Sequence, residues 1–261
     1  MGVASGVSKS EESRICAGLD AESAQIRERS LAHTSFPYIY LDATYCKVRV
    51  GAHVVSQALV IATGVSIDGS REVLGTAVGD SESFEFWREF LVSLKARGLS
   101  GVHLVISDAH AGLKSAVAQQ FQFASWQRCR VHFMRNLHTA VTRKQSPVVT
   151  AAIRTIFVHD DPKELEAQWD QVVASLESSC PKAAAMMVEA KADVLAFTSF
   201  PQAHWQKIWS NNPLERVNKE VKRRADVVEI FPNPPAFLRL ATAVVIEAHD
   251  EWQVTRRYMS E

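Results

Sequence analysis

Residues 38–50, YIYLDATYCKVRV, decide the fold of this chain. The segment is rich in aromatic and β-branched residues, which favour strands. A nearly continuous apolar run at 54–65 follows it, and a third run at 71–78 follows the turn Asp68-Gly69. Because short connections join antiparallel neighbours, these three segments predict a meander.

The next segments extend the same sheet. Residues 84–98 have apolar side chains at helical spacing and end at a glycine, which predicts a helix. A short buried strand at 102–106, a helix at 109–120 and a fifth strand at 124–128 follow. A strand–helix–strand unit forms a right-handed crossover, so we expect the fourth strand to lie parallel to the first. The chain is therefore predicted to have an α/β fold with a mixed five-stranded sheet flanked by helices.

The rest of the chain is predicted to be mainly helical. Residues 129–210 have helical periodicity, a helix starts near Asn212, and the last helix is expected from about Ala236 to Arg257. Residues 1–36 are polar and are predicted to form a loosely docked arm. Within it, a capping box at Ser8 predicts a helix that Gly18 stops, followed by a second helix to about Leu31.

Composition bounds the function. The chain has 261 residues, of which 47% are hydrophobic and 22% charged, as in a soluble globular protein. The 29 Lys and Arg residues equal the 29 Asp and Glu residues, so binding to nucleic acid requires local patches of charge. No apolar run is long enough to cross a membrane, and no secretion signal is evident. The four cysteines, without a CxxC pair, indicate reduced thiols. We therefore expect a cytoplasmic protein with no membrane partner.

Two stretches carry local positive charge. Residues 127–144 contain no acid but five cations: Arg128, Arg130, Arg135, Arg143 and Lys144. Residues 208–224, IWSNNPLERVNKEVKRR, combine one carboxylate, Glu215, with a run of cations that also surrounds Glu220: Arg216, Lys219, Lys222, Arg223 and Arg224. A carboxylate beside a basic surface suits metal-assisted chemistry on phosphodiesters, since the metal needs oxygen ligands and the substrate is a polyanion.

The second stretch also has a purely structural interpretation. Asn212 and Glu215 have the spacing of a capping box, in which Glu215 bonds back to the helix start. The cations are equally compatible with a solvated helix face on which Glu220 forms pairs at helical spacing. Residues elsewhere in the chain have to decide between these alternatives.

Two aspartates occupy unusual positions. Asp42 lies inside the first strand, where a charge is costly unless it is compensated. Asp108 follows the fourth strand, where it could cap the next helix or line the ligand-binding edge of the sheet. If strands one and four are parallel neighbours, the two carboxylates lie side by side. A divalent cation would relieve their repulsion, and Glu215 could supply a third ligand.

Four blocks in this order carry a family resemblance: LDATYCKVRV (41–50), VISDAHAGLKSAV (105–117), WQRCRVHFMRNL (126–137) and WSNNPLERVNKEVKRR (209–224). Together they resemble the Mutator-type transposases of bacterial insertion sequences. The resemblance implies a ribonuclease-H-like core at 37–128 and 211–261, with an all-helical insertion at 129–210 before the last catalytic helix. It also implies that residues 1–36 are the remnant of a helix-turn-helix region, so that the chain is truncated at its N-terminus.

The resemblance further implies a DDE active site of Asp42, Asp108 and Glu215 that binds two Mg²⁺ ions, with Mn²⁺ as a substitute. The expected reaction is cleavage at the ends of the element, followed by attack of the freed 3′-OH on target DNA. The implied partners are terminal inverted repeats, target DNA and, on the DNA, a second copy of the chain, all at the bacterial nucleoid. DNA would be held by the basic side chains Arg128, Arg130, Arg216, Lys219, Lys222, Arg223 and Arg224.

Three points stay open at this stage. Cys129 and His132 match a CxxH motif of the family, but no second pair makes a zinc site, so they are accessory residues that either pack beside the site or contact DNA. Ala225 and Glu229 stand where relatives more often have Thr and Gly. The alternatives to a transposase are a ribonuclease-H-like nuclease without strand transfer, or an inactive remnant that binds only DNA or full-length transposase.

Overall fold

The computed structural model describes residues 8–80, 82–255 and 257–259. The first seven residues of the predicted N-terminal arm and the last two residues of the predicted C-terminal part lie outside the described residues.

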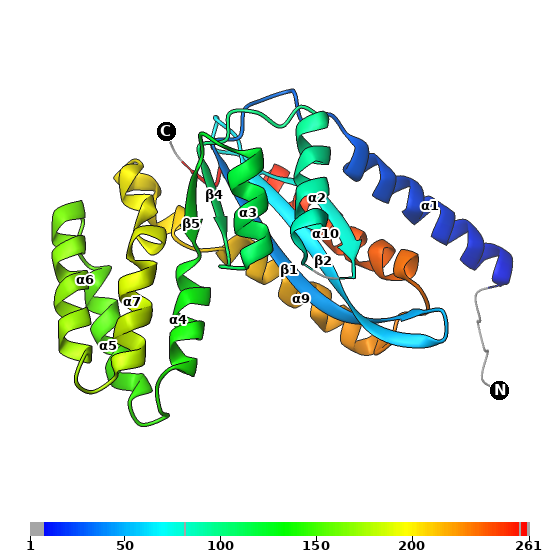
Figure 1. Cartoon of the computed structure of the whole chain (residues 1–261). Coiled ribbons are helices and arrows are strands. Elements are labelled where there is room, and N and C mark those ends of the chain that lie inside the picture. Colours follow the sequence, from blue (N-terminus) through cyan, green and yellow to red (C-terminus); the bar gives the residue numbers. More distant parts are fainter. Residues whose placement is uncertain (1–7, 81, 256, 260–261) are drawn as a thin grey trace.

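One mixed sheet organises the molecule, with the strand order β3-β2-β1-β4-β5 (Figure 1). The strands β1 to β3 are antiparallel neighbours, whereas β4 lies parallel to β1 and β5 parallel to β4. Their bounds are β1 Tyr38–Val50, β2 His53–Val65, β3 Arg71–Gly79, β4 Leu104–Ser107 and β5 Ser125–Arg128. The predicted mixed five-stranded sheet is confirmed. The strand β4 begins at Leu104, two residues later than expected. At this point the backbone N–H groups of His103 and Leu104 both donate to the carbonyl of Pro37.

The hairpin of β1 and β2 is paired along its whole length, from Tyr38 opposite Val65 to Val50 opposite His53. The turn has two residues, and the first of them, Gly51, has a φ of +61°. A two-residue hairpin turn requires such a positive φ, and glycine adopts it without a steric penalty. The long hairpin extends β1 well beyond its short parallel neighbour β4 (Figure 1).

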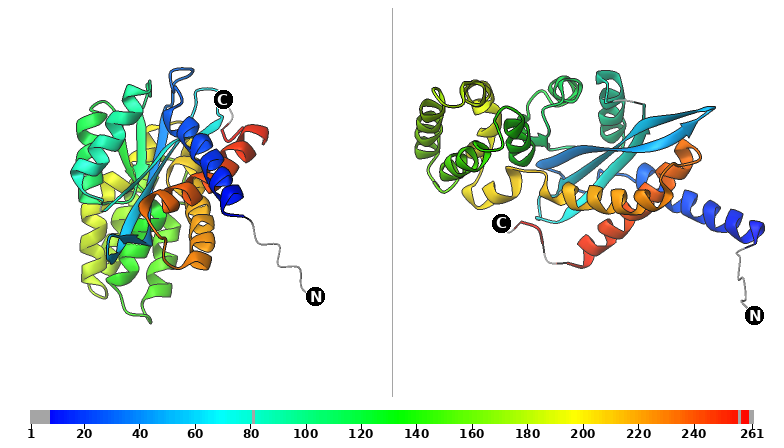
Figure 2. Two further views of the ribbon diagram at one scale, coloured as in Figure 1. Left: turned by 90° about the vertical axis from the view of Figure 1, so that its right-hand side faces the viewer. Right: turned by 90° about the horizontal axis from the view of Figure 1, so that it is seen from below.

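The two faces of the sheet are covered by different helices. The side chains of Ile39 and Leu41 pack with helices α2 (Phe84–Ala96) and α3 (Ala111–Gln120). The alternate residues Tyr38 and Tyr40 point to the opposite face, where α9 (Asn212–Val228) and α10 (Pro234–Val254) pack, as the view from below in Figure 2 shows. Because strand side chains alternate, Asp42 belongs to the face that α9 covers.

All regular structure between residues 129 and 210 is helical: α4 Arg130–Thr139, α5 Ser146–Ile156, α6 Pro162–Leu176, α7 Pro181–Val194, the 3₁₀ helices η1 Ala196–Ser199 and η2 Gln202–His204, and α8 Trp205–Ile208. These helices have no separate core. Their buried side chains, including Phe133 and Trp169, belong to the same hydrophobic cluster as Tyr38 and Tyr40 of the sheet. Packing therefore joins the helical segment directly to the α9 face of the sheet.

The prediction of two N-terminal helices separated at Gly18 is wrong. Ser8 forms the expected capping box with Glu11, but α1 then continues through Gly18 from Lys9 to Glu28. A glycine inside a helix costs only about 1 kcal/mol relative to alanine. Contacts with α10 outweigh this cost, among them a two-pronged ion pair between Arg239 and Asp20 at 2.7 Å. Part of the predicted arm is also firmly packed, since Leu31 and Phe36 are completely buried.

The C-terminal end returns to the sheet. Helix α10 ends at Val254, earlier than predicted, because Thr255 adopts an extended conformation. The backbone N–H groups of Tyr258 and Met259 then donate to the carbonyl of Gly69 in the β2–β3 turn, at 2.9 and 3.1 Å. These bonds hold the ring of Tyr258 beside the start of β3.

Candidate active site

Strand register brings Asp42 and Asp108 to the same edge of the sheet. Tyr40 of β1 is the partner of Ile106 of β4, and each aspartate lies two residues further along its own chain. Both aspartates therefore follow the last paired residues of parallel neighbours and belong to the same face. Carboxyl ends of parallel strands are where open α/β sheets bind their ligands.

Asp108 does not cap the helix that follows it. The N-cap of α3 is His110, which makes no side-chain cap bond, and within the described residues the carboxylate of Asp108 accepts a hydrogen bond only from the adjacent N–H of Ala109. The capping interpretation of Asp108 is therefore wrong. Its carboxylate remains available at the edge of the sheet.

The start of α9 is fixed against β1 by Asn211. This residue is completely buried, and its side-chain N–H donates to the carbonyl of Leu41 at 2.8 Å. Its backbone N–H donates to the thiol sulfur of Cys129 at 3.3 Å. These bonds anchor the helix next to the residue that precedes Asp42. The apolar stripe of Leu214, Val217 and Val221 is buried, as its spacing predicted.

Glu215 does not form the capping box that its spacing allowed. The N-cap of α9 is Asn211 rather than Asn212, and no side chain caps the helix. Instead, Oε1 of Glu215 lies 3.4 Å from Nη2 of Arg135 and 4.0 Å from Nε2 of His132. The carboxylate thus faces α4 across the edge of the sheet.

Asp42 is the buried carboxylate of the group, with 8% of its surface exposed. Its Oδ2 accepts a hydrogen bond from Asn218 of α9 at 2.8 Å, and its Oδ1 accepts one from the N–H of Ala43 at 3.0 Å. Burial raises the pKa of Asp42 to about 6. The negative charges of Glu215 and Asp108 contribute to this rise, while His132 and the Ala43 bond oppose it. Glu215 and Asp108 are therefore both near enough to act electrostatically on Asp42.

His132 lies beside these acids, which favour its protonated form. Burial alone would lower its pKa, but Cys129 and the carboxylates of Asp42 and Asp108 together raise it above its usual range. Cys129 is completely buried beneath α9, so it does not reach DNA in this structure. This arrangement matches the interpretation in which the pair packs beside the site.

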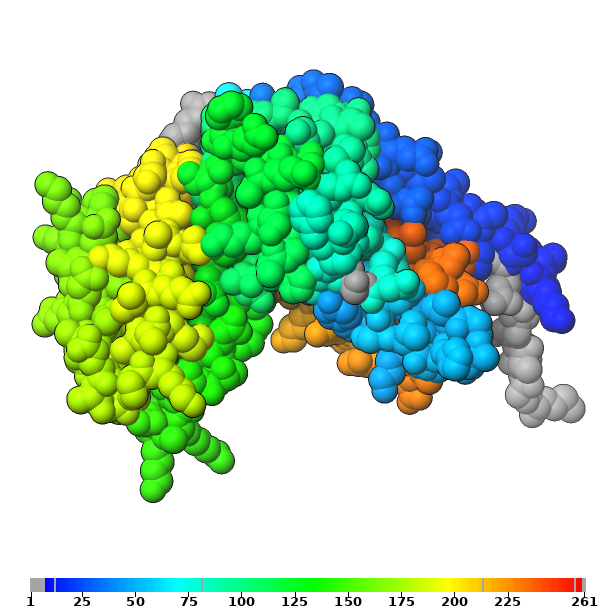
Figure 3. All heavy atoms as spheres, in the orientation of Figure 1, coloured from blue at the N-terminus to red at the C-terminus, as the bar shows by residue number. Residues whose placement is uncertain are grey.

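A cavity of about 590 Å³ opens in front of Asp42 and Glu215. Its walls come from β1, α4 and α9, and they carry mixed charges: Asp42, Ala43, Thr44, His132, Arg135, Glu215, Asn218, Lys219, Lys222, Arg223 and Asp226. Asp108 is not among these lining residues. In Figure 3 the molecule is hollowed between the helical segment and the β1–β2 hairpin, with part of α9 visible in orange at the back.

The carboxylates are not arranged as a metal site in this conformation. Among the described residues, no group of three or more His, Cys, Asp and Glu side chains is arranged to hold a metal ion. The chemistry of the donors nevertheless fits one. Asp42 is a buried carboxylate with a raised pKa, and a bound cation would lower that pKa again. Glu215 is held by an ion pair with Arg135, whose side chain is 63% exposed. Such pairs contribute roughly 0–1 kcal/mol, so reorienting Glu215 toward Asp42 is inexpensive.

The predicted DNA-binding residues divide into three groups. Lys219, Lys222 and Arg223 line the cavity in front of Asp42. Arg216 and Arg224 point toward α10, where they pair with Glu251 and Glu247.

Arg128 and Arg130 make up the third group and contact aromatic rings. The guanidinium of Arg128 lies 5.1 Å from the ring centroid of Phe133, and that of Arg130 lies 3.9 Å from that of Trp209. These cation–π contacts give both side chains a packing role.

Sequence reasoning missed three residues of the site: Asn218, Asn211 and Arg135. Asn218 lies three positions after Glu215, so helical spacing already placed both on one face of α9. Asn211 was considered only as a helix cap, and Arg135 only as part of a basic segment. Their partners, Leu41 and Glu215, are 170 and 80 positions away, which no local pattern reveals.

Burial of Asp42 predicts a measurable cost in stability. Its pKa is raised on folding, so the protonated form favours the native state and stability falls as pH rises from about 4 to about 6. In metal-free buffer at pH 7.5, we expect Asp42→Asn to increase the free energy of unfolding by up to about 3 kcal/mol. Urea denaturation in EDTA measures the difference.

The gain should shrink as pH falls and disappear below about pH 3, where Asp42 of the wild type is protonated in both states. The exposed Asp250 gives the control, because Asp250→Asn should leave stability unchanged at both pH values. A less stable Asp42→Asn protein at pH 7.5 would show that the carboxylate is compensated by its partners.

Within the described residues, no helix is both long and apolar enough to span a bilayer.

Comparison with known proteins gives a consistent family. The model of the Mutator transposase family matches residues 1–255. Among curated relatives, the transposase of insertion sequence element IS1081 from Mycobacterium tuberculosis is 43% identical over 97% of this chain and 61% of its own length. The ISRM5 transposase of Rhizobium meliloti is 39% identical, over 97% and 63%. The transposase of IS256 in transposon Tn4001 of Staphylococcus aureus is 37% identical, over 97% and 66%. The chain thus spans about three fifths to two thirds of the length of these relatives.

Proposed function

This chain belongs to the Mutator family of transposases, and from this membership we propose that it supplies the catalytic core of a DNA transposase. The proposed reaction is Mg²⁺-dependent cleavage of DNA strands at the ends of an insertion sequence, followed by transfer of the freed 3′-OH into target DNA. The observation that carries the proposal is the placement of Asp42 and Asp108 two residues beyond a parallel strand pair, with Asp42 hydrogen-bonded to Asn218 of the helix that carries Glu215.

The topology supports a ribonuclease-H-like core. The strand that carries Asp42 is central in the order β3-β2-β1-β4-β5, and its parallel neighbour β4 leads directly to Asp108. The helix with Glu215 packs on the face to which Asp42 points. The all-helical segment lies between Asp108 and Glu215 in the sequence, as expected for an insertion before the last catalytic helix.

Asp42, Asp108 and Glu215 would hold the divalent cations. Bound Mg²⁺ would supply Lewis-acid stabilisation of the negative charge that develops during phosphoryl transfer. The protein's own side chains orient the carboxylate of Asp42 and neutralise the charge of Glu215. Asn218 keeps Oδ2 of Asp42 in a fixed direction through its hydrogen bond. His132 and Arg135 hold Glu215 in the absence of metal.

The rim of the cavity would hold the substrate. Lys219, Lys222 and Arg223 project from α9 next to the acids, and phosphate contacts of this kind bind DNA without regard to sequence.

Strand joining tests the function. The purified chain is incubated with Mg²⁺, a supercoiled plasmid and a labelled duplex that copies the genomic DNA flanking the coding sequence and ends in a free 3′-OH. We expect the label to become covalently attached to the plasmid, and to require Mg²⁺ or Mn²⁺. Nicking of the plasmid without attachment of label would indicate a nuclease that lacks strand transfer. Neither product with either metal would contradict an enzymatic role for this chain.

A further inference from the structure

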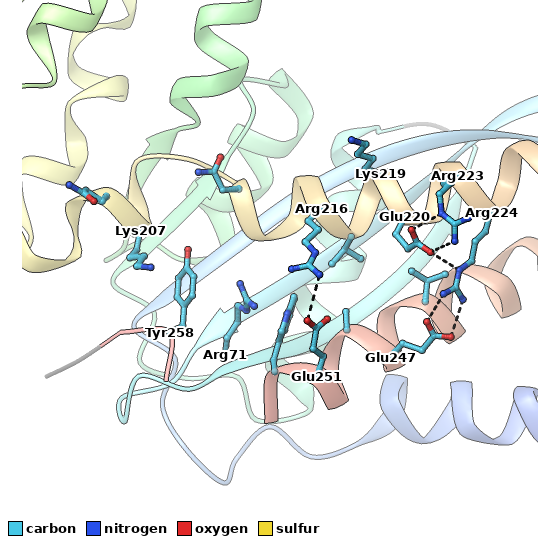
Figure 4. Close-up of a pocket in the computed structure, with 16 residues that line it drawn as sticks. Arg71, Lys207, Arg216, Lys219, Glu220, Arg223, Arg224, Glu247, Glu251 and Tyr258 are labelled. Atoms are coloured by element: carbon cyan, nitrogen blue, oxygen red, sulfur yellow. Dashed lines mark hydrogen bonds and ion pairs between the residues drawn. The ribbon is translucent and has the colours of Figure 1, made fainter. Parts of the chain in front are cut away.

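A second cavity, of about 620 Å³, lies between α9 and α10. One face of α9 lines the candidate active-site cavity, and the adjacent face of the same helix lines this second cavity. The two cavities share Lys219 and Arg223. Figure 4 shows its wall of charged side chains, with Arg71 and Arg216 directed into the gap between the helices. We call this cavity the α9–α10 groove.

Each acid of the groove already has a cationic partner. Glu220 accepts hydrogen bonds from Arg223 and Arg224, and Glu247 binds Arg224 through both oxygens (Figure 4). Glu251 lies 3.5 Å from Arg216. The ion pairs in the described part of the chain leave Arg71, Lys207 and Lys219 without an acidic partner. The groove therefore has an excess of positive charge, although the chain as a whole has none.

Arg71 is the most constrained of these cations. Its guanidinium lies 3.7 Å from the ring centroid of Trp252 in α10 and 4.7 Å from that of Tyr258 in the C-terminal segment. Burial lowers the pKa of Arg71, and its buried Nε has no hydrogen-bond partner among the described residues. A half-buried guanidinium without an acceptor is costly unless a ligand completes its hydrogen bonds.

The C-terminal segment helps to build this arrangement. The Tyr258 ring, held by the bonds to Gly69, also lies 4.7 Å from Nζ of Lys207 in α8. Two cations thus contact one aromatic ring. Because these interactions fix the direction of Arg71 and Lys207 before any ligand arrives, little side-chain entropy is lost on binding.

We propose that the α9–α10 groove binds the phosphodiester backbone of a nucleic acid strand that continues from the active-site cavity. The inference rests on the proposed function and adds a second contact surface to it. Arg71, Lys207 and Arg216 contact phosphates in the groove, and Lys219 and Arg223 contact the strand where it crosses α9.

The shared residues favour a long polyanion over a small anion. Lys219 and Arg223 line both cavities, so a ligand with regularly spaced negative charges can occupy both at once. The ring face of Tyr258 is occupied by Arg71 and Lys207, which makes the groove a surface for the backbone rather than for stacked bases. Contacts to the backbone are independent of base sequence.

The variant Arg71→Gln tests the proposal through salt dependence. Binding of a fluorescein-labelled duplex of mixed sequence with a single-stranded 3′ extension is measured over a range of salt concentrations. Loss of one phosphate contact should weaken binding about tenfold at low salt. It should also reduce the slope of log K against log salt by about 0.7 for a single strand or 0.9 for a duplex.

Arg88 provides the matched control. It lies on α2, on the other face of the sheet, and its nearest acid is Glu89 at 3.8 Å, so Arg88→Gln should leave both affinity and slope unchanged. Lys207→Gln is the second test variant, because Lys207 is exposed and its replacement leaves the core intact. Should Arg71→Gln fail to fold, Lys207→Gln decides the outcome.

Wild-type slopes in both variants would overturn the proposal. It would also fail if a polyglutamate peptide, but not DNA, bound in a manner that depends on Arg71, since the groove would then be a site for an acidic protein. DNA cleavage by the Asp42→Asn variant is measured in parallel with these binding experiments. Normal cleavage by that variant would remove the proposed active site while leaving the result for the groove valid.

Discussion

Each of the variants Asp42→Asn, Asp108→Asn and Glu215→Gln is expected to lose DNA cleavage by roughly a thousandfold or more. Removing a ligand of shared cations costs several kcal/mol of transition-state stabilisation, and each 1.36 kcal/mol is a factor of ten in rate. The amide replacements are nearly isosteric, and the buried Asp42 keeps an oxygen that can accept the Ala43 N–H. The fold should therefore persist, as near- and far-ultraviolet circular dichroism would show.

DNA binding separates loss of chemistry from loss of substrate. Lys219, Lys222 and Arg223 remain in place in all three variants, so their affinity for a mixed-sequence duplex should equal or exceed that of the wild type. The exposed Asp250 supplies a control, since Asp250→Asn removes the same charge away from the cavity and should cleave normally. Cleavage near the wild-type rate by any one of the three would remove that residue from the site.

The second large effect is expected from Trp169→Ala in the helical segment. Trp169 is completely buried, stacks on Phe133 of α4 with a centroid distance of 5.8 Å, and donates a hydrogen bond to the carbonyl of Met187 at 3.2 Å. Truncation leaves a large cavity and should lower the free energy of unfolding by about 3–5 kcal/mol. This is a large part of the roughly 5–15 kcal/mol that stabilises a typical domain.

The same change should disturb the candidate active site. Phe133 follows His132 in the sequence and lies on the same helix as Arg135, so loosening α4 moves both partners of Glu215. Urea denaturation gives the stability, with Val188→Ala on the exposed face of α7 as the control that should change it by less than about 0.5 kcal/mol. A loss below about 1 kcal/mol for Trp169→Ala would show that the helical segment packs independently of this pair.

Much of the candidate site was predictable because its elements obey local rules. An aspartate in the middle of an aromatic and β-branched strand is conspicuous, and Asp108 stands immediately after a buried strand. The crossover rule then places the two strands in parallel. Glu215 was harder to assign, because helix-start chemistry and metal-ligand chemistry use the same side chain. The structure excludes the capping box, because no side chain caps α9, and the metal-ligand role stays a prediction.

Other parts of the prediction failed or stayed open where distant contacts decide. Local propensity predicts that a helix ends at Gly18. The Arg239–Asp20 ion pair and the packing on α10 stabilise α1 as one continuous helix across this glycine. Arg130 is as basic in sequence as Lys222, yet it lies against the ring of Trp209 while Lys222 lines the cavity.

The sequence by itself determined the order of strands and helices, the alternation that turns Asp42 toward α9, and the helical spacing that pairs Glu215 with Asn218. These features follow from the period of two in strands and 3.6 in helices, which backbone geometry imposes on every residue. Only the tertiary structure decided which charges meet: Glu215 with Arg135 and His132, and Arg71 with two aromatic rings. Those contacts join residues far apart in the chain, and their choice depends on how whole elements pack.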